Sequence, residues 1–76
     1  MITTEYDIAH MFGLNYIEKR YVELYKFEYY IFSFHGKDIF YPYPTVTEDY
    51  AKEVVAKFIL RKIGEEAGKN LRTIIL

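Results

Sequence analysis

The most regular pattern of hydrophobic and polar positions lies in the C-terminal half of the chain. From position 51 to position 63, apolar residues recur at spacings of three and four, which is the period of a helix that buries one face. Thr47 is expected to cap this helix, and Gly64 or Gly68 to end it. Apolar residues occupy roughly 240° of its helical wheel, whereas an ordinary surface helix has an apolar stripe of ~100°. We therefore expect this helix to be covered on two sides, by the C-terminal tail or by a second copy of the protein.

A shorter helix of about ten residues is predicted near the N-terminus. Thr3 or Thr4 can cap it, and acidic residues follow in its first turn. Gly13 is suited to end it, because glycine readily adopts the left-handed conformation that closes a helix. The apolar face of this helix, which we expect to be buried, consists of Ile8, Met11 and Phe12.

The middle of the chain is rich in aromatic residues and is typical of β-structure. Between positions 29 and 34, both alternating sets of side chains are largely apolar, which suits a central strand or a strand whose outer face meets a partner. Gly36 lies in the predicted turn, and residues 39–41 form the return strand. Pro42 and Pro44 cannot donate a backbone hydrogen bond to a sheet, so they end this strand or mark an edge.

Residues 16–26 fit neither a helix nor a strand cleanly, and the fold depends on them. As a strand, they complete an α+β domain of order α-β-β-β-α, with a three-stranded antiparallel sheet and a short C-terminal strand within residues 71–76. As a helix, they give a winged helix-turn-helix instead. We favour the first fold, in a single domain spanning residues 1–76, and keep the second as the alternative.

Length and charge narrow the functional classes. The chain of 76 residues is long enough for one small domain, and domains of this size often depend on self-association for stability. It contains no cysteine, so neither a disulfide nor a zinc–thiolate site can stabilise it. Ten basic residues against eleven acidic residues give a net charge of −1, which provides no excess of positive charge for binding phosphates.

Composition also bears on where the protein works. No apolar run approaches the length of about 18 residues that a transmembrane helix needs, so we expect no membrane association. The N-terminal residues are acidic where a signal peptide is basic, which predicts a cytoplasmic protein. Many Lys, Glu, Ile and Tyr residues, together with the absence of Gln and Cys, favour a thermophilic source.

Several short patterns lie at corresponding places in the α-β-β-β-α order. They are Ile8-Ala9 before Gly13-Leu14 in the first helix, residues 32–36 in the middle strand and its turn, and Ala51-Lys52, Ala56-Lys57 and Leu60 in the second helix. Over roughly residues 5–62, these patterns resemble the double-stranded-RNA-binding domain. The resemblance implies this fold and a duplex-RNA surface at the start of the second helix, where Lys52 would contact phosphate.

The chain departs from this family in its charges. The family places two or three lysines at the start of its second helix, whereas this chain has Glu48 and Asp49 before Lys52. Loss of two phosphate contacts lowers the slope of log affinity against log salt by about 1.8 units. The loop between the first two strands is also shorter than in the family. We therefore expect a surface adapted to protein contacts rather than to duplex RNA.

The winged helix-turn-helix alternative resembles small phage excisionases and related regulators. Residues 7–15 then form the first helix and its turn, and the hairpin at Gly36 forms the wing. In this alternative, a DNA- or RNA-binding regulator, the base- and phosphate-reading residues are Asn15, Lys19 and Arg20.

Motifs of catalysis are missing from the sequence. It has no phosphate loop, Rossmann fingerprint or nucleophile elbow. Ser33, the only serine, lies in an apolar strand, and His10 follows Asp7 by three positions without a nucleophile nearby in the sequence. We predict that the protein is not an enzyme, with no catalytic residues, no metal site and no cofactor.

The remaining features favour a small non-catalytic binding or adaptor protein. We expect it to act through protein–protein contacts and self-association, as a homo-oligomer or with a protein partner. Tyrosines beside the prolines and at the start of the long helix are suited to such contacts, because Tyr is enriched at interfaces. The predicted partner interface consists of Leu60, Ile63, Leu71, Ile74, Ile75, Tyr41, Tyr43 and Tyr50.

Overall fold

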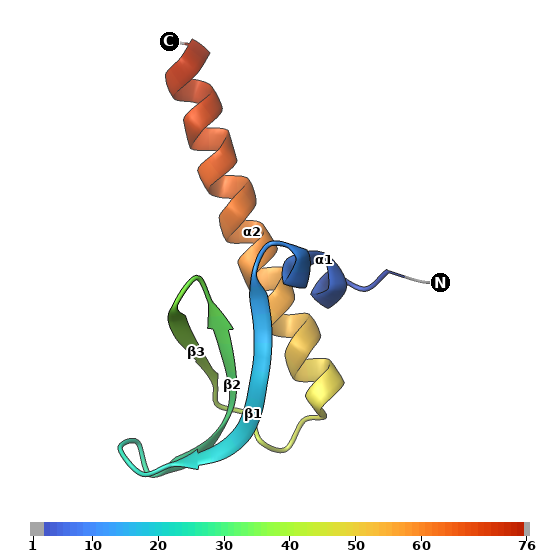
Figure 1. The fold of residues 1–76 in the computed structure, drawn as a ribbon, viewed down its shortest axis with the longest axis vertical. Coiled ribbons are helices and arrows are strands. Elements are labelled where there is room, and N and C mark those ends of the chain that lie inside the picture. The colour runs from blue at the N-terminus through green and yellow to red at the C-terminus, as the bar shows by residue number, and fades with distance from the viewer. Residues whose placement is uncertain (1–2, 76) are drawn as a thin grey trace.

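The computed structural model describes the backbone of residues 3–75 and the side chains of residues 3–66. Its elements are, in chain order, α1 (Glu5–Met11), β1 (Leu14–Val22), β2 (Phe27–Phe34), β3 (Lys37–Tyr41) and α2 (Glu48–Ile75) (Figure 1). This small α+β fold with an open three-stranded sheet confirms the predicted α-β-β-β-α order.

Residues 16–26 decide between the two folds that the sequence left open. Most of them belong to β1, which pairs with β2 from Leu14 to Val22, and the rest form a turn at positions 23–26. The winged helix-turn-helix alternative is therefore wrong. Antiparallel pairing satisfies the backbone hydrogen bonds of this segment, and it buries Leu14 against the helices.

The sheet is an antiparallel meander of order β1-β2-β3, so β2 lies in its centre. β1 contains a bulge at Ile17, because its neighbours Tyr16 and Glu18 pair with consecutive residues of β2. His35 and Gly36 form the turn between β2 and β3, with φ angles of 50° and 78°. Two positive φ angles are what a two-residue hairpin turn of type I′ requires, and the turn predicted at Gly36 is confirmed.

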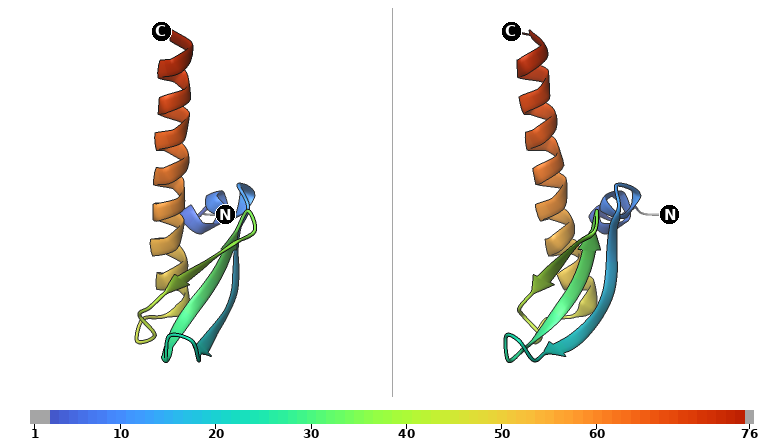
Figure 2. Two further views of the ribbon diagram at one scale, coloured as in Figure 1. Left: turned by 90° about the vertical axis from the view of Figure 1, so that its left-hand side faces the viewer. Right: turned by 60° about the vertical axis from the view of Figure 1, so that its left-hand side comes forward.

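Both helices pack on the same side of the sheet (Figure 2). Between them and the sheet, Leu14 and Phe32 are the largest fully buried side chains. Ala9 of α1 and Ala51 and Ala56 of α2 are also completely buried, and their small side chains allow close approach of the backbones. The other buried residues of this core are Tyr30, Val55 and Ile59.

The apolar face predicted for the first helix is not buried, so this expectation is wrong. α1 instead turns Ala9 inwards, together with the half-buried Tyr6. The Tyr6 hydroxyl accepts a hydrogen bond of 2.9 Å from the backbone N–H of Tyr16, which fixes the rotation of the helix against β1. The larger side chains then point to solvent, and Met11 is 82% exposed. The exposed residues of the predicted face are Ile8, Met11 and Phe12.

α2 begins where the sequence predicts and ends later. The Thr47 hydroxyl accepts a hydrogen bond of 3.1 Å from a backbone N–H of the first turn, which confirms the cap. The helix then continues through Gly64 and Gly68 to Ile75, so both the predicted end at a glycine and the predicted short C-terminal strand are wrong. A glycine inside a helix costs only about 1 kcal/mol relative to alanine, which this long helix tolerates. Leu76 lies outside the described residues.

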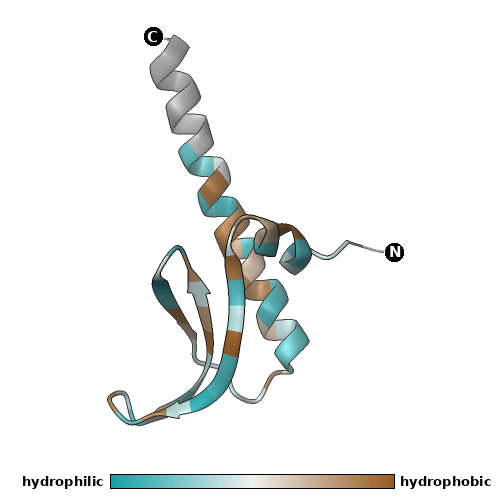
Figure 3. Cartoon of the chain, viewed as in Figure 1, coloured by the Kyte–Doolittle hydropathy of each residue, from teal (hydrophilic) through white to brown (hydrophobic). Residues whose placement is uncertain are grey.

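The C-terminal part of α2 extends beyond the sheet (Figure 1). The radius of gyration is 14.6 Å, whereas a compact domain of this length has about 11 Å. In Figure 3, hydrophobic residues of α2 lie along the part that passes the sheet and α1. The core therefore sits at one end of the molecule, between the sheet, α1 and the N-terminal half of α2.

Candidate interaction surfaces

The sheet face that points away from the helices carries a cluster of aromatic rings. Tyr30 and Ile39 pack into the helix-side core, so the alternation of a strand directs their neighbours Tyr29 and Phe40 to the opposite face. We call this face the open face, and its four rings the open-face cluster: Tyr25, Phe27, Tyr29 and Phe40.

The rings of the open-face cluster contact one another edge to face. The centroid of Tyr29 lies 5.6 Å from those of Phe27 and Phe40, and 5.9 Å from that of Tyr25. Tyr25 also lies 5.8 Å from Phe40, which links the turn at positions 23–26 to β3. Edge-to-face pairs at these distances are favoured by the ring quadrupoles, so the four rings form one continuous surface.

Ile31 forms the centre of the open face. It is only 4% exposed, although it is not part of the helix-side core. It pairs with Glu18 of β1 and Phe40 of β3, so side chains of both neighbouring strands enclose it. The open face thus has a small apolar core of its own. Two rings of the open-face cluster stay about half exposed: Phe27 (44%) and Tyr25 (53%).

Within residues 3–75, no helix or loop crosses the open face (Figure 2). Alternation directs charged residues of both signs to this face: Glu18 and Arg20, which pair at 3.3 Å, and Asp38 of β3. This surface is therefore largely aromatic and close to neutral. Apolar residues on both faces of β2 were the sequence pattern that predicted this surface. The contacts of Tyr25 and Phe40 with that strand depend on the tertiary structure and could not be predicted from the pattern.

The three tyrosines predicted to contact a partner lie near one another. Tyr41 ends β3, and its ring centroid lies 5.2 Å from that of Tyr43. Burial raises the pKa of the Tyr41 hydroxyl, and the hydroxyls of Tyr50 and Tyr43 raise it further. Tyr43 and Tyr50 are more than half exposed, whereas Tyr41 packs against the core. Two of the three are thus accessible to a partner.

The aliphatic residues of the predicted interface divide into two groups. Leu60 and Ile63 are half-buried and pack against the core of their own chain, so only part of each is open to a partner. The side chains of Leu71, Ile74 and Ile75 lie outside the described residues, although their backbone belongs to α2.

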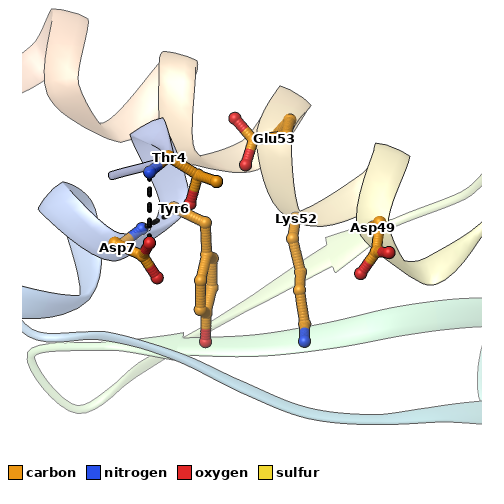
Figure 4. Close-up of a pocket in the computed structure, with 6 residues that line it drawn as sticks. All are labelled: Thr4, Tyr6, Asp7, Asp49, Lys52 and Glu53. Carbon is orange, nitrogen blue, oxygen red and sulfur yellow. Dashed lines mark hydrogen bonds between the residues drawn. The ribbon is translucent and has the colours of Figure 1, made fainter. Parts of the chain in front are cut away.

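A groove runs between the start of α1 and the first turns of α2 (Figure 4). Thr4 and Asp7 form a capping box at one side, with two hydrogen bonds of 3.1 Å between side chains and backbone N–H groups. This confirms Thr4 as the cap of α1. Three carboxylates and a single lysine line the groove, so it is acidic. The lining residues are Thr4, Tyr6, Asp7, Asp49, Lys52 and Glu53.

Lys52 is held by side chains of its own chain. Its Nζ lies 3.1 Å from Glu48 Oε2, and 5.3 Å and 5.2 Å from the ring centroids of Tyr6 and Tyr16. Burial and the nearby Glu48 carboxylate raise the pKa of Tyr16 to about 12, because both disfavour the phenolate. These four residues belong to α1, β1 and α2. Lys52 therefore helps to pack the three elements against one another.

The four candidate nucleic-acid residues do not form one surface. Lys19 points to the helix side, where its Nζ donates to the Pro44 carbonyl oxygen at 2.8 Å and lies over the Tyr30 ring. Lys52 is on the same side, in the groove. Strand alternation directs the other two to the open face, where Asn15 Nδ2 donates to the Gly13 carbonyl oxygen and Arg20 pairs with Glu18.

The residues considered for catalysis have structural partners. His10 Nδ1 lies 2.8 Å from the Leu14 carbonyl oxygen, and its ring stacks on Tyr6. Asp7, three positions before His10, is engaged with Thr4 in the capping box. Among the described residues, no group of three or more His, Cys, Asp or Glu side chains is arranged to hold a metal ion.

Comparison with known proteins gives no relative. No family model, no curated protein and no solved structure matches this chain. In the described part of the chain, neither helix combines the length and the apolar character needed to cross a membrane. The interaction surfaces above are therefore the basis for assigning a function.

Proposed function

We propose that this protein is a small non-catalytic binding protein that acts through protein–protein contacts, including association with a second copy of itself. One observation carries the proposal: the open face presents a continuous aromatic surface that no described element covers. Soluble proteins rarely leave a large apolar patch exposed unless it binds something. Tyr and Phe are also among the residues enriched at protein interfaces.

Charge favours a protein partner over a nucleic acid. A platform that stacks single-stranded bases combines its rings with a positively charged groove that follows the phosphates. On the open face, Arg20 is paired with Glu18 and leaves no such groove. Single-strand binding is thus the weaker use of these aromatic rings.

The alternative proposal is binding of duplex RNA by a domain that resembles the double-stranded-RNA-binding domain. The α-β-β-β-α order and the position of Lys52 on the first turns of α2 support it. The charges oppose it, because Glu48 pairs with Lys52 at 3.1 Å and Asp49 lines the same groove as Lys52. A phosphate would have to displace a carboxylate from Lys52 and approach a second one.

Two measurements on the full chain test the proposal. Size-exclusion chromatography with light scattering, from about 1 µM to about 1 mM, is expected to give a dimer or a larger species. Binding to duplex RNA is expected to be undetectable even at about 50 mM salt, where phosphate contacts are strongest. A monomer at every concentration, together with tight RNA binding that responds steeply to salt, would overturn the proposal and favour the alternative.

A further inference from the structure

We propose that the open face of the sheet is a homodimer interface, at which two copies pack face to face about a two-fold axis. This inference rests on the self-association in the proposed function and specifies its surface. It differs from the sequence-based prediction, which assigned self-association to α2 and its last residues. Three observations favour a second copy over another occupant: the area of the patch, the protection of the sheet edges and the balance of charge.

The exposed apolar area approaches what a dimer of ordinary size needs. Tyr25 and Phe27 are about half exposed, and at roughly 200 Å² for each aromatic side chain they leave on the order of 200 Å² uncovered. Leu24, in the turn beside Tyr25, is 82% exposed, and with the half-buried rings it brings the total to about 400 Å². A standard interface buries ~800 Å² per partner, of which ~65% is apolar in homodimers.

The edges of the sheet are poorly suited to pairing with another strand. β1 carries the bulge at Ile17, followed by three consecutive charged residues at positions 18–20. β3 has only five residues, and Pro42 follows it directly. Bulges, charges, short strands and prolines are the features that keep edge strands from extending a sheet. Association through the sheet is therefore expected to use its face.

The charges of the open face suit a copy of the same face. A two-fold axis brings each patch against itself, so a surface of one sign would repel its copy. Here Glu18 and Arg20 lie side by side at 3.3 Å, so either residue can approach its opposite in the partner. The aromatic rings then occupy the space between two sheets, which pack ~10 Å apart when they meet face to face.

Matched variants test the surface. Phe27→Lys places a charge on the open face, and Phe58→Lys places the same charge on α2, where Phe58 is 55% exposed against 44% for Phe27. The two variants have equal net charge, so general repulsion between subunits changes equally. We expect Phe27→Lys to raise the dimer dissociation constant roughly a hundredfold or more, because each dimer contains the substitution twice at a buried aromatic position. Phe58→Lys is expected to change it less than threefold, as a rim or non-interface residue would.

Cross-linking provides a second measurement, which does not require the open face to accept a charged side chain. The chain has no cysteine, so Phe27→Cys and Phe58→Cys each introduce one defined thiol. A short bis-maleimide is expected to join two Phe27→Cys chains covalently at low micromolar protein, and to leave Phe58→Cys chains separate. Circular dichroism of every variant shows whether it is folded. If Phe27→Lys does not fold, Phe27→Thr replaces it, because threonine is well suited to a strand.

The outcomes separate this inference from the proposed function. Suppose the wild type is a dimer, Phe27→Lys still forms the dimer and Phe27→Cys chains do not cross-link. The open face is then not the interface, while self-association stands. If Leu71→Lys alone abolishes the dimer, the interface is the one predicted from the sequence on α2. If the wild type is a monomer up to about 1 mM, face-to-face pairing and self-association both fail.

Discussion

Lys52 and Glu48 form an ion pair across one turn of α2, with 3.1 Å between Nζ and Oε2. In a double-stranded-RNA-binding domain, the first turns of the second helix present lysines to phosphate. Here the lysine at this place is turned onto the rings of Tyr6 and Tyr16 and neutralised by an acidic residue one turn earlier. The Lys52 side chain thus stabilises the fold, whereas the resemblance implies that it contacts RNA.

We therefore predict that Lys52→Met lowers the free energy of unfolding by about 1 kcal/mol. The methionine keeps the apolar stem, whereas the ion pair, worth ~0.3–0.5 kcal/mol, and the cation–π contacts, worth ~0.5–1 kcal/mol, are lost. Urea unfolding followed by circular dichroism measures the change. Lys57→Met is the matched control, because Lys57 is exposed on the same helix. Equal losses in the two variants would show that Lys52 has no special role.

Tyr16 predicts a decrease in stability at alkaline pH. Its pKa is about 12 in the folded protein against 10.0 for an ordinary tyrosine, because of burial and the nearby Glu48 carboxylate. Above pH 10 the unfolded chain loses this proton first, so the free energy of unfolding falls between pH 10 and about pH 12. Below pH 10 both states keep the proton, and the group contributes no pH dependence.

Urea unfolding at a series of pH values from 8 to about 12 measures this effect. Tyr16→Phe is expected to make the decrease shallower, since the titrating group is removed. The remaining decrease is assigned in part to Tyr41, whose pKa burial also raises. A wild-type and a Tyr16→Phe protein with identical pH profiles would contradict the prediction.

The core predicts a large difference between two phenylalanines. Phe32 is completely buried in the centre of the sheet, whereas Phe58 is mostly exposed on α2. Phe32→Ala is expected to cost ~3–5 kcal/mol, which approaches the whole stability of about 4–11 kcal/mol for a chain of this length. Phe58→Ala is expected to cost less than about 1 kcal/mol. Thermal unfolding by circular dichroism compares them, and similar losses would place the core elsewhere.

Two glycines predict changes of opposite sign. A Cβ added at Gly64 meets nothing within 4 Å, so Gly64→Ala is expected to stabilise the protein by ~0.5–1 kcal/mol through its helix propensity. Gly13 has a φ of 112°, and a Cβ there would lie 3.3 Å from the His35 ring. Gly13→Ala is expected to destabilise the protein by about 1 kcal/mol or more. Denaturation midpoints measure both, and stabilisation by Gly13→Ala would contradict the observed turn.

The sequence predicted the order of the elements and the start of each helix, because these depend on local signals. Thr4 and Thr47 act through hydrogen bonds within one turn, and Gly36 through its own backbone angle. The ambiguity at residues 16–26 has a physical cause in the bulge at Ile17. Side chains at positions 14 and 16 face the helices, and after the bulge those at 19 and 21 do so, which breaks the alternation expected of a strand.

Features that depend on tertiary packing could not be predicted from the pattern of hydrophobic and polar residues. The rotation of α1 is set by Ala9 and by the hydrogen bond of Tyr6 to β1, so the more hydrophobic Met11 is exposed. The open-face cluster unites rings from a turn and two strands, and only the register of β2 and β3 brings Phe40 to Tyr29. The end of α2 was misjudged because isolated glycines weaken a long helix without ending it.

The meander topology has a consequence for the route by which the chain folds. Each strand pairs with its neighbour in sequence, so both hairpins close short loops at a small entropic cost. The contact between α1 and α2, by contrast, joins elements on either side of the entire sheet and closes the longest loop. We expect the hairpins to form early and the docking of the two helices to complete the transition, so that the slowest contact to form is the one nearest the chain's ends.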